Sequence, residues 1–244
     1  MKKIIINYAH AGFFNSQDTN VQSAIDIGGF TDGVKYRIED LDEHFVRKNH
    51  HILSQKRGAG YWLWKPYIIL KTLKQMEDDD ILFYSDAAIE FTANMNDYFQ
   101  FCKEDEKGVV LFYNNHHLNY VWTKRDCFIL MGLDNTSPPG DPTPCAAYSR
   151  QVNAAIQIYR KTDFSLAFCE EYLNACQDPR ILTDLPNTLG KENYDGYREH
   201  RHDQSIVSLL RFKHSVLAKE DITQWAPFSG FGHEVLLNHH RRRA

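Results

Sequence analysis

The segment Asp80-Ile-Leu-Phe-Tyr-Ser-Asp86-Ala-Ala constrains the fold of this chain more than any other. Its short apolar run predicts a strand over Ile81–Ser85 that is buried on both faces. The strand ends on Asp86, and the two small residues that follow leave this carboxylate uncrowded. Ligands of α/β proteins bind at the carboxyl ends of the strands, so Asp86 is a candidate ligand for a metal or a nucleotide. The alternative is that Asp86 caps a helix or completes a turn.

Strands and helices alternate along the chain. Further strands are predicted over Lys3–Tyr8, Val34–Ile38 and Val109–Tyr113, with a weaker one over Cys145–Tyr148. Helices are predicted over Leu41–His50, Lys65–Met76, Asn96–Cys102, Arg150–Arg160 and Phe164–Cys176. This alternation is typical of an α/β domain with a mostly parallel central sheet flanked by helices. We expect one domain over residues 1–220, followed by a C-terminal appendage and basic tail over residues 221–244.

Two segments lack a regular pattern. The proline-rich stretch 135–144 predicts a loop, and residues 181–200 predict an ordered irregular segment.

Composition argues against several classes of protein. A net charge of −4, with Arg241–Arg243 as the only basic block, does not indicate a nucleic-acid partner. The N-terminal apolar run Ile4–Ile6 is too short for a signal peptide, and no stretch of about 18 apolar residues predicts a transmembrane segment. Five scattered cysteines without a Cys-x-x-Cys pair argue against a disulfide framework. We therefore expect a cytoplasmic protein.

A second motif is Arg57-Gly-Ala-Gly-Tyr-Trp-Leu-Trp-Lys65-Pro66. Its glycines allow the backbone to turn tightly or approach a ligand, and the helix that begins near Pro66 offers its positive end to an anion. Arg57 and Lys65 add positive charge, and Tyr61 adds a stacking face. The motif indicates a site for a phosphate and a ring. Equally compatible is a loop–helix junction in which the aromatic residues anchor the helix.

A third motif is His200-Arg-His-Asp-Gln-Ser205, ahead of an apolar helical run. Capping of that helix by Asp203 is one interpretation. The run of consecutive polar residues is longer than a cap requires. His202 offers a nitrogen able to bind a metal, and Gln204 offers an amide for a sugar hydroxyl. Asp203 and Gln204 are therefore candidate site residues, and His202 is a candidate metal ligand.

These motifs occur in a fixed order with two others. The segments are Ile4-Ile-Ile-Asn-Tyr-Ala, Gly60-Tyr-Trp-Leu-Trp-Lys-Pro, Asp80-Ile-Leu-Phe-Tyr-Ser-Asp-Ala, Trp122-Thr-Lys-Arg-Asp and His200-Arg-His-Asp-Gln-Ser-Ile. In this combination the chain resembles a family of bacterial and virus-encoded glycosyltransferases of the GT-A fold, linked to capsule and surface-glycan synthesis. The resemblance extends over about residues 1–212. It implies a GT-A (Rossmann-like) domain that moves a sugar from a nucleotide donor, a UDP- or GDP-sugar, to a glycan or lipid-linked acceptor.

The resemblance also implies roles for residues. The family's Asp-x-Asp region maps to Asp86, which is expected to bind Mn²⁺ or Mg²⁺ and the ribose–diphosphate. This chain departs from that pattern, because Tyr84 and Ala88 stand where a second Asp is expected. The implied nucleotide-sugar site has Tyr8 and His10 beside the base, Arg57 and Lys65 at phosphate or sugar oxygens, Asp203 and Gln204 at the transferred sugar, and Tyr61, Ser85 and Ala87 completing it.

The chemistry of transfer explains these residue types. Cleavage between the anomeric carbon and the phosphate builds negative charge on the diphosphate, which cations stabilise. An inverting enzyme needs a carboxylate base at the acceptor hydroxyl, and a retaining enzyme needs a group on the opposite face. Asp203 is the candidate catalytic residue for either outcome.

Two other classes stay open. A metal-dependent phosphohydrolase or nucleotidyltransferase would use the same carboxylate and metal, but it predicts further clustered acids; Glu90 qualifies only if the chain turns back after Ala88. The second is a non-catalytic nucleotide-sugar or carbohydrate-binding protein with a degenerate site. The paired carboxylates of a glycoside hydrolase are not indicated.

Overall fold

The computed structural model describes residues 1–10, 12–135, 144–225 and 235–240. Its centre is a six-stranded sheet in the order β2-β1-β3-β6-β5-β7. The strands are β1 (Lys3–Tyr8), β2 (Asp32–Tyr36), β3 (Ile81–Ser85), β5 (Val109–Leu118), β6 (Arg150–Arg160) and β7 (Leu217–Glu220). The pairs β2/β1, β1/β3 and β5/β7 are parallel, and β6 is antiparallel to both of its neighbours. The prediction of a single α/β domain with a mostly parallel central sheet is confirmed.

The prediction of a helix over Arg150–Arg160 is wrong, because this segment is β6. Its Ala, Asn and Gln residues have weak strand propensity. However, β6 lies between β3 and β5, and every residue from 151 to 159 is buried. Pairing on both edges and burial on both faces outweigh the local propensity. The weaker strand predicted over Cys145–Tyr148 is also wrong, since Ala146–Tyr148 forms a short 3-10 helix, η3.

Helices cover the sheet. They are α1 (Phe14–Ser23), α2 (Glu43–Lys48), α3 (His50–Leu53), α4 (Gly58–Tyr61), α5 (Trp64–Gln75), α6 (Asn96–Glu104), α7 (Asn119–Trp122), α8 (Arg125–Leu130), α9 (Asp163–Cys176), α10 (Pro179–Leu182) and α11 (Asp203–Lys213), with the π-helix η1 (Ala24–Gly28) and the 3-10 helix η2 (Ile38–Asp40). The helices predicted over Lys65–Met76, Asn96–Cys102 and Phe164–Cys176 are confirmed as α5, α6 and α9. The helix predicted over Leu41–His50 is interrupted at Asn49, between α2 and α3.

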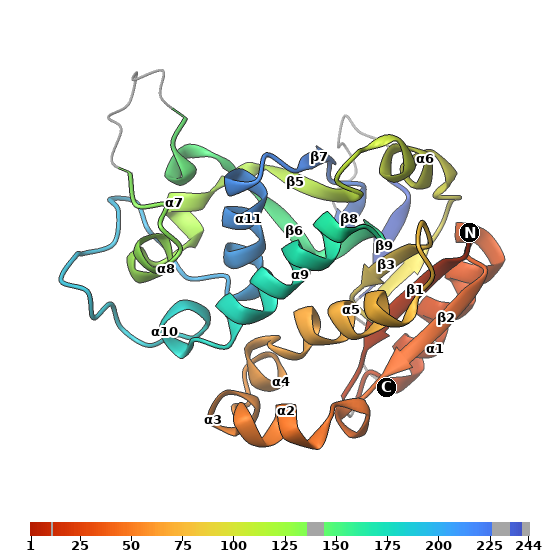
Figure 1. Cartoon of the computed structure of the whole chain (residues 1–244), viewed down its shortest axis with the longest axis horizontal. Helices are drawn as coiled ribbons and strands as arrows, with labels where there is room; N and C mark the ends of the chain where they lie inside the picture. Colours follow the sequence, from red (N-terminus) through yellow and green to blue (C-terminus); the bar gives the residue numbers. More distant parts are fainter. Residues whose placement is uncertain (11, 136–143, 226–234, 241–244) are drawn as a thin grey trace.

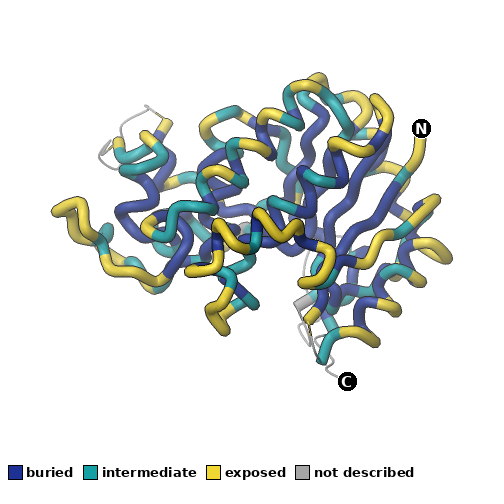
Figure 2. The backbone as a smooth tube through the Cα atoms, turned by 60° about the horizontal axis from the view of Figure 1, so that its bottom comes forward, coloured by how far each residue is buried: buried dark blue, intermediate teal, exposed yellow. Residues whose placement is uncertain are grey.

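Two hydrophobic cores lie on opposite faces of the sheet. Helices α5, α9 and α11 cross one face (Figure 1), where they pack on Ile4, Ile6 and Leu82. The intervening residues Ile5 and Phe83 belong to the second core, with residues of η1 and α6. Because alternate residues of a strand point to opposite faces, the apolar runs of β1 and β3 supply both cores. Figure 2 shows these central strands buried along most of their length.

A small second sheet brings the end of the chain beside the segment that follows β3. It has the order β4-β9-β8, from β4 (Ile89–Phe91), β8 (Thr223–Trp225) and β9 (Leu237–His239). In its register Ile89 pairs with His239, and the backbone N–H of His240 donates to the carbonyl of Ala88. The C-terminal segment is thereby held close to Asp86.

Residues 183–200 form neither helix nor strand, which confirms the predicted irregular segment except for Ile181 and Leu182, which end α10. Most of the predicted loop over 135–144 and the basic tail Arg241–Arg243 lie outside the described residues. Within the described ranges, no helix has both the length and the apolar character needed to span a membrane.

Candidate active site

Asp86 lies at the end of β3, as the sequence predicts. Its backbone N–H donates to the carbonyl of Ala155 on β6 at 2.8 Å, and its carbonyl accepts from Ile89 N at 3.1 Å, which closes a turn. The phenol of Tyr84 donates to Asp86 Oδ1 at 2.6 Å. Since 34% of the side chain remains exposed, the carboxylate is fixed in place and still open to a ligand.

Lys65 and Asp203 form a buried ion pair beside Asp86. Lys65 Nζ lies 2.6 Å from Asp203 Oδ2 and 3.6 Å from Asp86 Oδ1, and it also donates to the carbonyl of Ala154 at 3.2 Å. Only 3% of the lysine side chain and 5% of the Asp203 side chain are exposed. The two residues come from the first turns of α5 and α11, which meet at this edge of the sheet.

Burial and the neighbouring charges shift the pKa values of both residues. Burial alone would lower the pKa of Lys65, but the carboxylates of Asp203 and Asp86 outweigh it and raise the pKa above its ordinary value. Burial raises the pKa of Asp203, against the opposing effect of Lys65. A buried carboxylate with a raised pKa is the kind of group that serves as a general base.

Gln204 follows Asp203 and ties the start of α11 to β6. Its amide oxygen accepts from Ala154 N at 3.3 Å, and its Nε2 donates to Gln151 Oε1 at 2.9 Å. The side chain is partly exposed and faces the same pocket as Asp86 and Asp203. That pocket has a volume of about 220 Å³ and is lined further by Arg57, Trp62, Arg201, His202 and His239.

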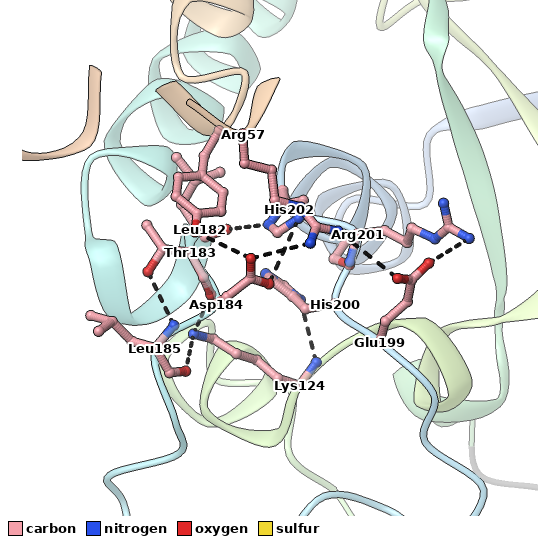
Figure 3. Close-up of polar contacts among 12 residues, drawn as sticks. Arg57, Lys124, Leu182, Thr183, Asp184, Leu185, Glu199, His200, Arg201 and His202 are labelled. Atoms are coloured by element: carbon pink, nitrogen blue, oxygen red, sulfur yellow. Dashed lines mark hydrogen bonds and ion pairs between the residues drawn. The ribbon is translucent and has the colours of Figure 1, made fainter. Parts of the chain in front are cut away.

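The loop before α5 has an unusual backbone. Ala59, Tyr61 and Trp62 all have positive φ, and Gly60, with φ of +99°, leaves no room for a side chain because a Cβ would lie 2.7 Å from Leu53 Cα. Arg57 is partly exposed and pairs with Asp184 at 3.4 Å and Glu199 at 3.9 Å (Figure 3). Its guanidinium is thus held at the mouth of the pocket by two carboxylates.

The predicted base-binding residues lie apart from these charges. Tyr8 is buried, with its ring stacked on Trp64 at 4.0 Å between ring centroids. Burial and the charge of Glu39 raise the pKa of Tyr8 to about 12. His10 is exposed, and its ring lies beside that of Phe13 with 5.3 Å between the ring centroids. Neither residue lines the pocket around Asp86.

Ser85 and Ala87 flank Asp86 but face inward. The Ser85 hydroxyl accepts from Asn20 Nδ2 at 2.7 Å, and Ala87 is buried. Asn20 also donates to the carbonyl of Ile89 at 2.7 Å, so a single amide on α1 holds both sides of the turn that carries Asp86. Sequence analysis did not identify Asn20, because no local pattern marks a contact over this distance in the chain.

His202 precedes α11 with a positive φ of 54°. Its Nδ1 is 2.9 Å from the carbonyl of Leu182, and its Nε2 is 3.9 Å from Asp184 Oδ1. Burial lowers its pKa to about 4, so the ring is neutral at pH 7. The ring borders the pocket, and its two nitrogens face the Leu182 carbonyl and the Asp184 carboxylate.

The donor groups around Asp86 determine whether the pocket fits a metal ion. Among the described residues, no cluster of three or more His, Cys, Asp or Glu side chains could hold a metal ion by itself. Asp86 and the imidazole of His239 line the same pocket, and Mn²⁺ accepts both oxygen and nitrogen ligands. Such a pair fits an ion that phosphate oxygens and water also coordinate. Only the β4–β9 pairing brings His239 here.

Comparison with known structures identifies the fold of this chain, whereas comparison of sequences identifies no family. No family model and no curated protein matches this chain. Mouse xyloside xylosyltransferase 1 is similar in structure, with a TM-score of 0.52 and 10% identity over 98% of this chain and 97% of that one. The galactosyltransferase LgtC, solved with donor and acceptor sugar analogues, has a TM-score of 0.51 and 11% identity over 98% of this chain and 87% of that one. The chain therefore has the fold of GT-A-type glycosyltransferases.

Proposed function

We propose that this chain transfers a sugar from a nucleotide-diphosphate sugar to a hydroxyl group of a glycan or lipid-linked acceptor. The observation that carries the proposal is the pocket at the end of β3, where Asp86 stands beside the Lys65–Asp203 ion pair. The GT-A-type fold adds support, because both structural neighbours described above are sugar transferases.

The charged groups suit a diphosphate leaving group. Arg57 and Arg201 line the pocket, and both are partly exposed. In the structure they pair with Asp184 and Glu199, so a diphosphate would compete with these carboxylates for the two guanidinium groups. Preorganised cations of this kind stabilise the charge that develops as the bond to the sugar breaks.

Asp86 and His239 are the residues we propose to hold Mn²⁺ or Mg²⁺ with the donor. When bound, the ion would neutralise the two phosphates. Tyr84 and Lys65 orient the Asp86 carboxylate for this role. Because His239 belongs to the C-terminal segment, we propose that residues 1–220 carry the transferase chemistry and that the appendage over 221–244 completes the site.

Asp203 is the residue we propose to act on the transferred sugar or as the base for the acceptor hydroxyl. Its partner Lys65 holds the carboxylate in one orientation, and Tyr172 donates to the same oxygen at 3.4 Å. Gln204 lies next to it on the pocket wall and offers its amide to sugar hydroxyls.

We also propose a cytoplasmic location. All five cysteines are unpaired and buried, which suits a reducing compartment.

Donor binding is tested by thermal unfolding of the purified chain with UDP-, GDP-, CMP- and dTDP-sugars, each with Mn²⁺, Mg²⁺ or EDTA. A ligand at 100 times its Kd stabilises the folded state by about 2.7 kcal/mol. We expect stabilisation by one nucleotide class that is reduced by EDTA. Stabilisation that EDTA leaves unchanged would refute the metal part of the proposal and place the phosphate charge on the arginines. No stabilisation by any donor would refute nucleotide-sugar binding.

A further inference from the structure

A second pocket of about 400 Å³ lies next to the candidate active site. Its walls come from α3, α4, α10 and the irregular segment after α10. The lining includes Ile52, Gln55, Tyr61, Thr183, Asp184 and Leu185. Pockets that bind small molecules have volumes from about 300 to 1,000 Å³, so this one is large enough for a sugar unit.

One layer of side chains separates the two pockets. Tyr61 lines the second pocket, and its neighbour Trp62 lines the active-site pocket. The ring of His202 contacts both, with centroid distances of 5.0 Å to Tyr61 and 5.5 Å to Trp62. The second pocket is therefore built on the same wall as the site proposed for transfer.

Asp184 connects the two sides of this wall. Its carboxylate lies 3.4 Å from Arg57 and 3.9 Å from His202, both of which line the active-site pocket (Figure 3). On the other side the hydroxyl of Tyr61 donates to the same carboxylate at 3.2 Å. Some 43% of the Asp184 side chain remains exposed, so it can accept further hydrogen bonds.

Backbone strain is concentrated in the wall. Six non-glycine residues of the described chain have positive φ, and four of them are Ala59, Tyr61, Trp62 and His202. Such backbone conformations are strained, and they cluster at ligand sites where the surrounding structure enforces them. Here the strained turn directs Tyr61 and Trp62 into different pockets.

Hydrogen bonds from Lys124 fix the backbone at the rim of the second pocket. Lys124 is buried, and its ammonium donates to the carbonyls of Thr183 at 2.7 Å and Leu185 at 3.0 Å (Figure 3). These two residues line the pocket. The segment therefore presents Asp184 and Leu185 in one arrangement although it has no regular secondary structure.

The lining combines apolar surface with a few polar groups that suit a carbohydrate. An aromatic ring packs against the C–H face of a sugar, while a carboxylate and an amide accept and donate to its hydroxyls. Tyr61, Asp184 and Gln55 supply these groups, and Leu185, whose surface is 49% exposed, supplies an apolar edge. The negative charge of Asp184 disfavours a phosphate, which argues against a second nucleotide.

We propose that this pocket binds a neutral sugar unit of the acceptor glycan, one side-chain layer away from the site of transfer. The assignment of this sugar unit to the acceptor rests on the proposed function, whereas the binding of a sugar in the pocket does not. The pocket thus extends the recognition of the acceptor beyond the sugar that receives the bond.

The test uses the full chain and saturation-transfer NMR with the methyl glycosides of D-glucose, D-galactose, D-mannose and D-xylose. At least one glycoside should show saturation transfer in the presence of excess uridine diphosphate and guanosine diphosphate, because the two pockets are distinct. Leu185→Arg should weaken that glycoside at least tenfold. Leu189→Arg is the matched control: Leu189 is an exposed leucine of the same segment outside the pocket, so binding should be retained. Thermal unfolding confirms that both variants fold.

The proposal is overturned if no glycoside binds, if Leu185→Arg and Leu189→Arg bind equally, or if the nucleotides displace the glycoside. Its failure can be told apart from failure of the proposed function. Turnover of a nucleotide sugar without Leu185-dependent glycoside binding would refute only this pocket. Leu185-dependent binding without any turnover would leave the pocket in place and refute the transferase.

Discussion

The ammonium of Lys65 lies 2.6 Å from the carboxylate of Asp203 in the interior of the protein, where neither side chain is more than 5% exposed. The residues are far apart in the sequence, yet each begins a helix that meets the end of β3. The same ammonium lies 3.6 Å from Asp86. One buried cation thus links the two carboxylates to which we assign the chemistry.

Replacing Lys65 by Met should destabilise the fold by about 3–5 kcal/mol, because Asp203 would be left as an unpaired buried charge. Without its partner, the pKa of Asp203 rises further above the unfolded value. At pH 7 the folded variant then holds a proton on Asp203 that the unfolded chain releases. Folding of the variant therefore becomes less favourable as the pH rises, and the loss of stability is larger at pH 7 than at pH 5. Urea denaturation at both pH values measures this difference.

The control is the double variant Lys65→Met/Asp203→Asn, which removes both charges. It should be more stable than Lys65→Met at pH 7, because no buried charge remains unpaired. A single variant whose stability does not depend on pH would contradict the ion pair.

Asp86→Asn should lower nucleotide-sugar turnover by about a hundredfold, equivalent to about 2.7 kcal/mol. Asparagine keeps an oxygen that can accept from Tyr84, so the thermal stability should change little. Glu90→Gln is the matched control: Glu90 lies in β4 outside the pocket, and its replacement should leave turnover unchanged. Equal turnover by the Asp86 variant and the wild type would count against our assignment of Asp86.

Asn20→Ala should reduce turnover by about tenfold or more, because the turn that carries Asp86 loses the hydrogen bonds that Asn20 makes to Ser85 and Ile89. Three buried groups, on Asn7, Ser85 and Ile89, lose a hydrogen bond, so stability should also fall by about 1–3 kcal/mol. Gln22→Ala, which removes an exposed hydrogen bond to Asp26 near the same helix, is the control and should change neither quantity. Loss of stability without loss of turnover would refute a positioning role for Asn20.

The sequence predicted the parts of the site that a local pattern encodes. The run Ile81–Ser85 is apolar and short enough to identify a buried strand, and Asp86 marks its end. The sequence did not predict β6, because its residues have weak strand propensity and pair only in the complete sheet. Nor did it predict what Lys65 contacts. A lysine beside a helix start suggests an anion site, whereas the fold directs it to Asp203.

Long-range pairing explains the remaining residues that sequence analysis missed. His239 reaches the pocket only through the register of β9 on β4. Asp184 stands in an irregular segment without a motif, and its role depends on contacts with Arg57 and Tyr61 from another part of the chain. No spacing rule identifies either residue.

Asp134 should make stability depend on pH only in acid. Burial alone would raise the pKa of this carboxyl, but hydrogen bonds from Lys191, Arg125 and Tyr194 outweigh it and hold the pKa below its usual value. The stabilisation is therefore present above the unfolded pKa of about 3.9 and lost as pH falls through the lower folded value.

Urea denaturation of Asp134→Asn from pH 3 to pH 7 checks this sign. The difference from the wild type should be constant above about pH 5 and should shrink as the pH falls below about 4. Asp195→Asn, at an exposed position of the irregular segment that holds Lys191 and Tyr194, should behave as the wild type. A difference that persists undiminished at pH 3 would mean that the carboxylate charge is not what anchors the segment.

The most direct test of the central claim is the release of nucleoside diphosphate from UDP- and GDP-sugars by the purified wild-type chain, with Mn²⁺ and a mixture of glycan acceptors. We predict release from one nucleotide class, faster with acceptor than without, and about a hundredfold slower in Asp86→Asn. Absence of release from every donor, with or without metal, would contradict the assignment of this chain as a nucleotide-sugar transferase.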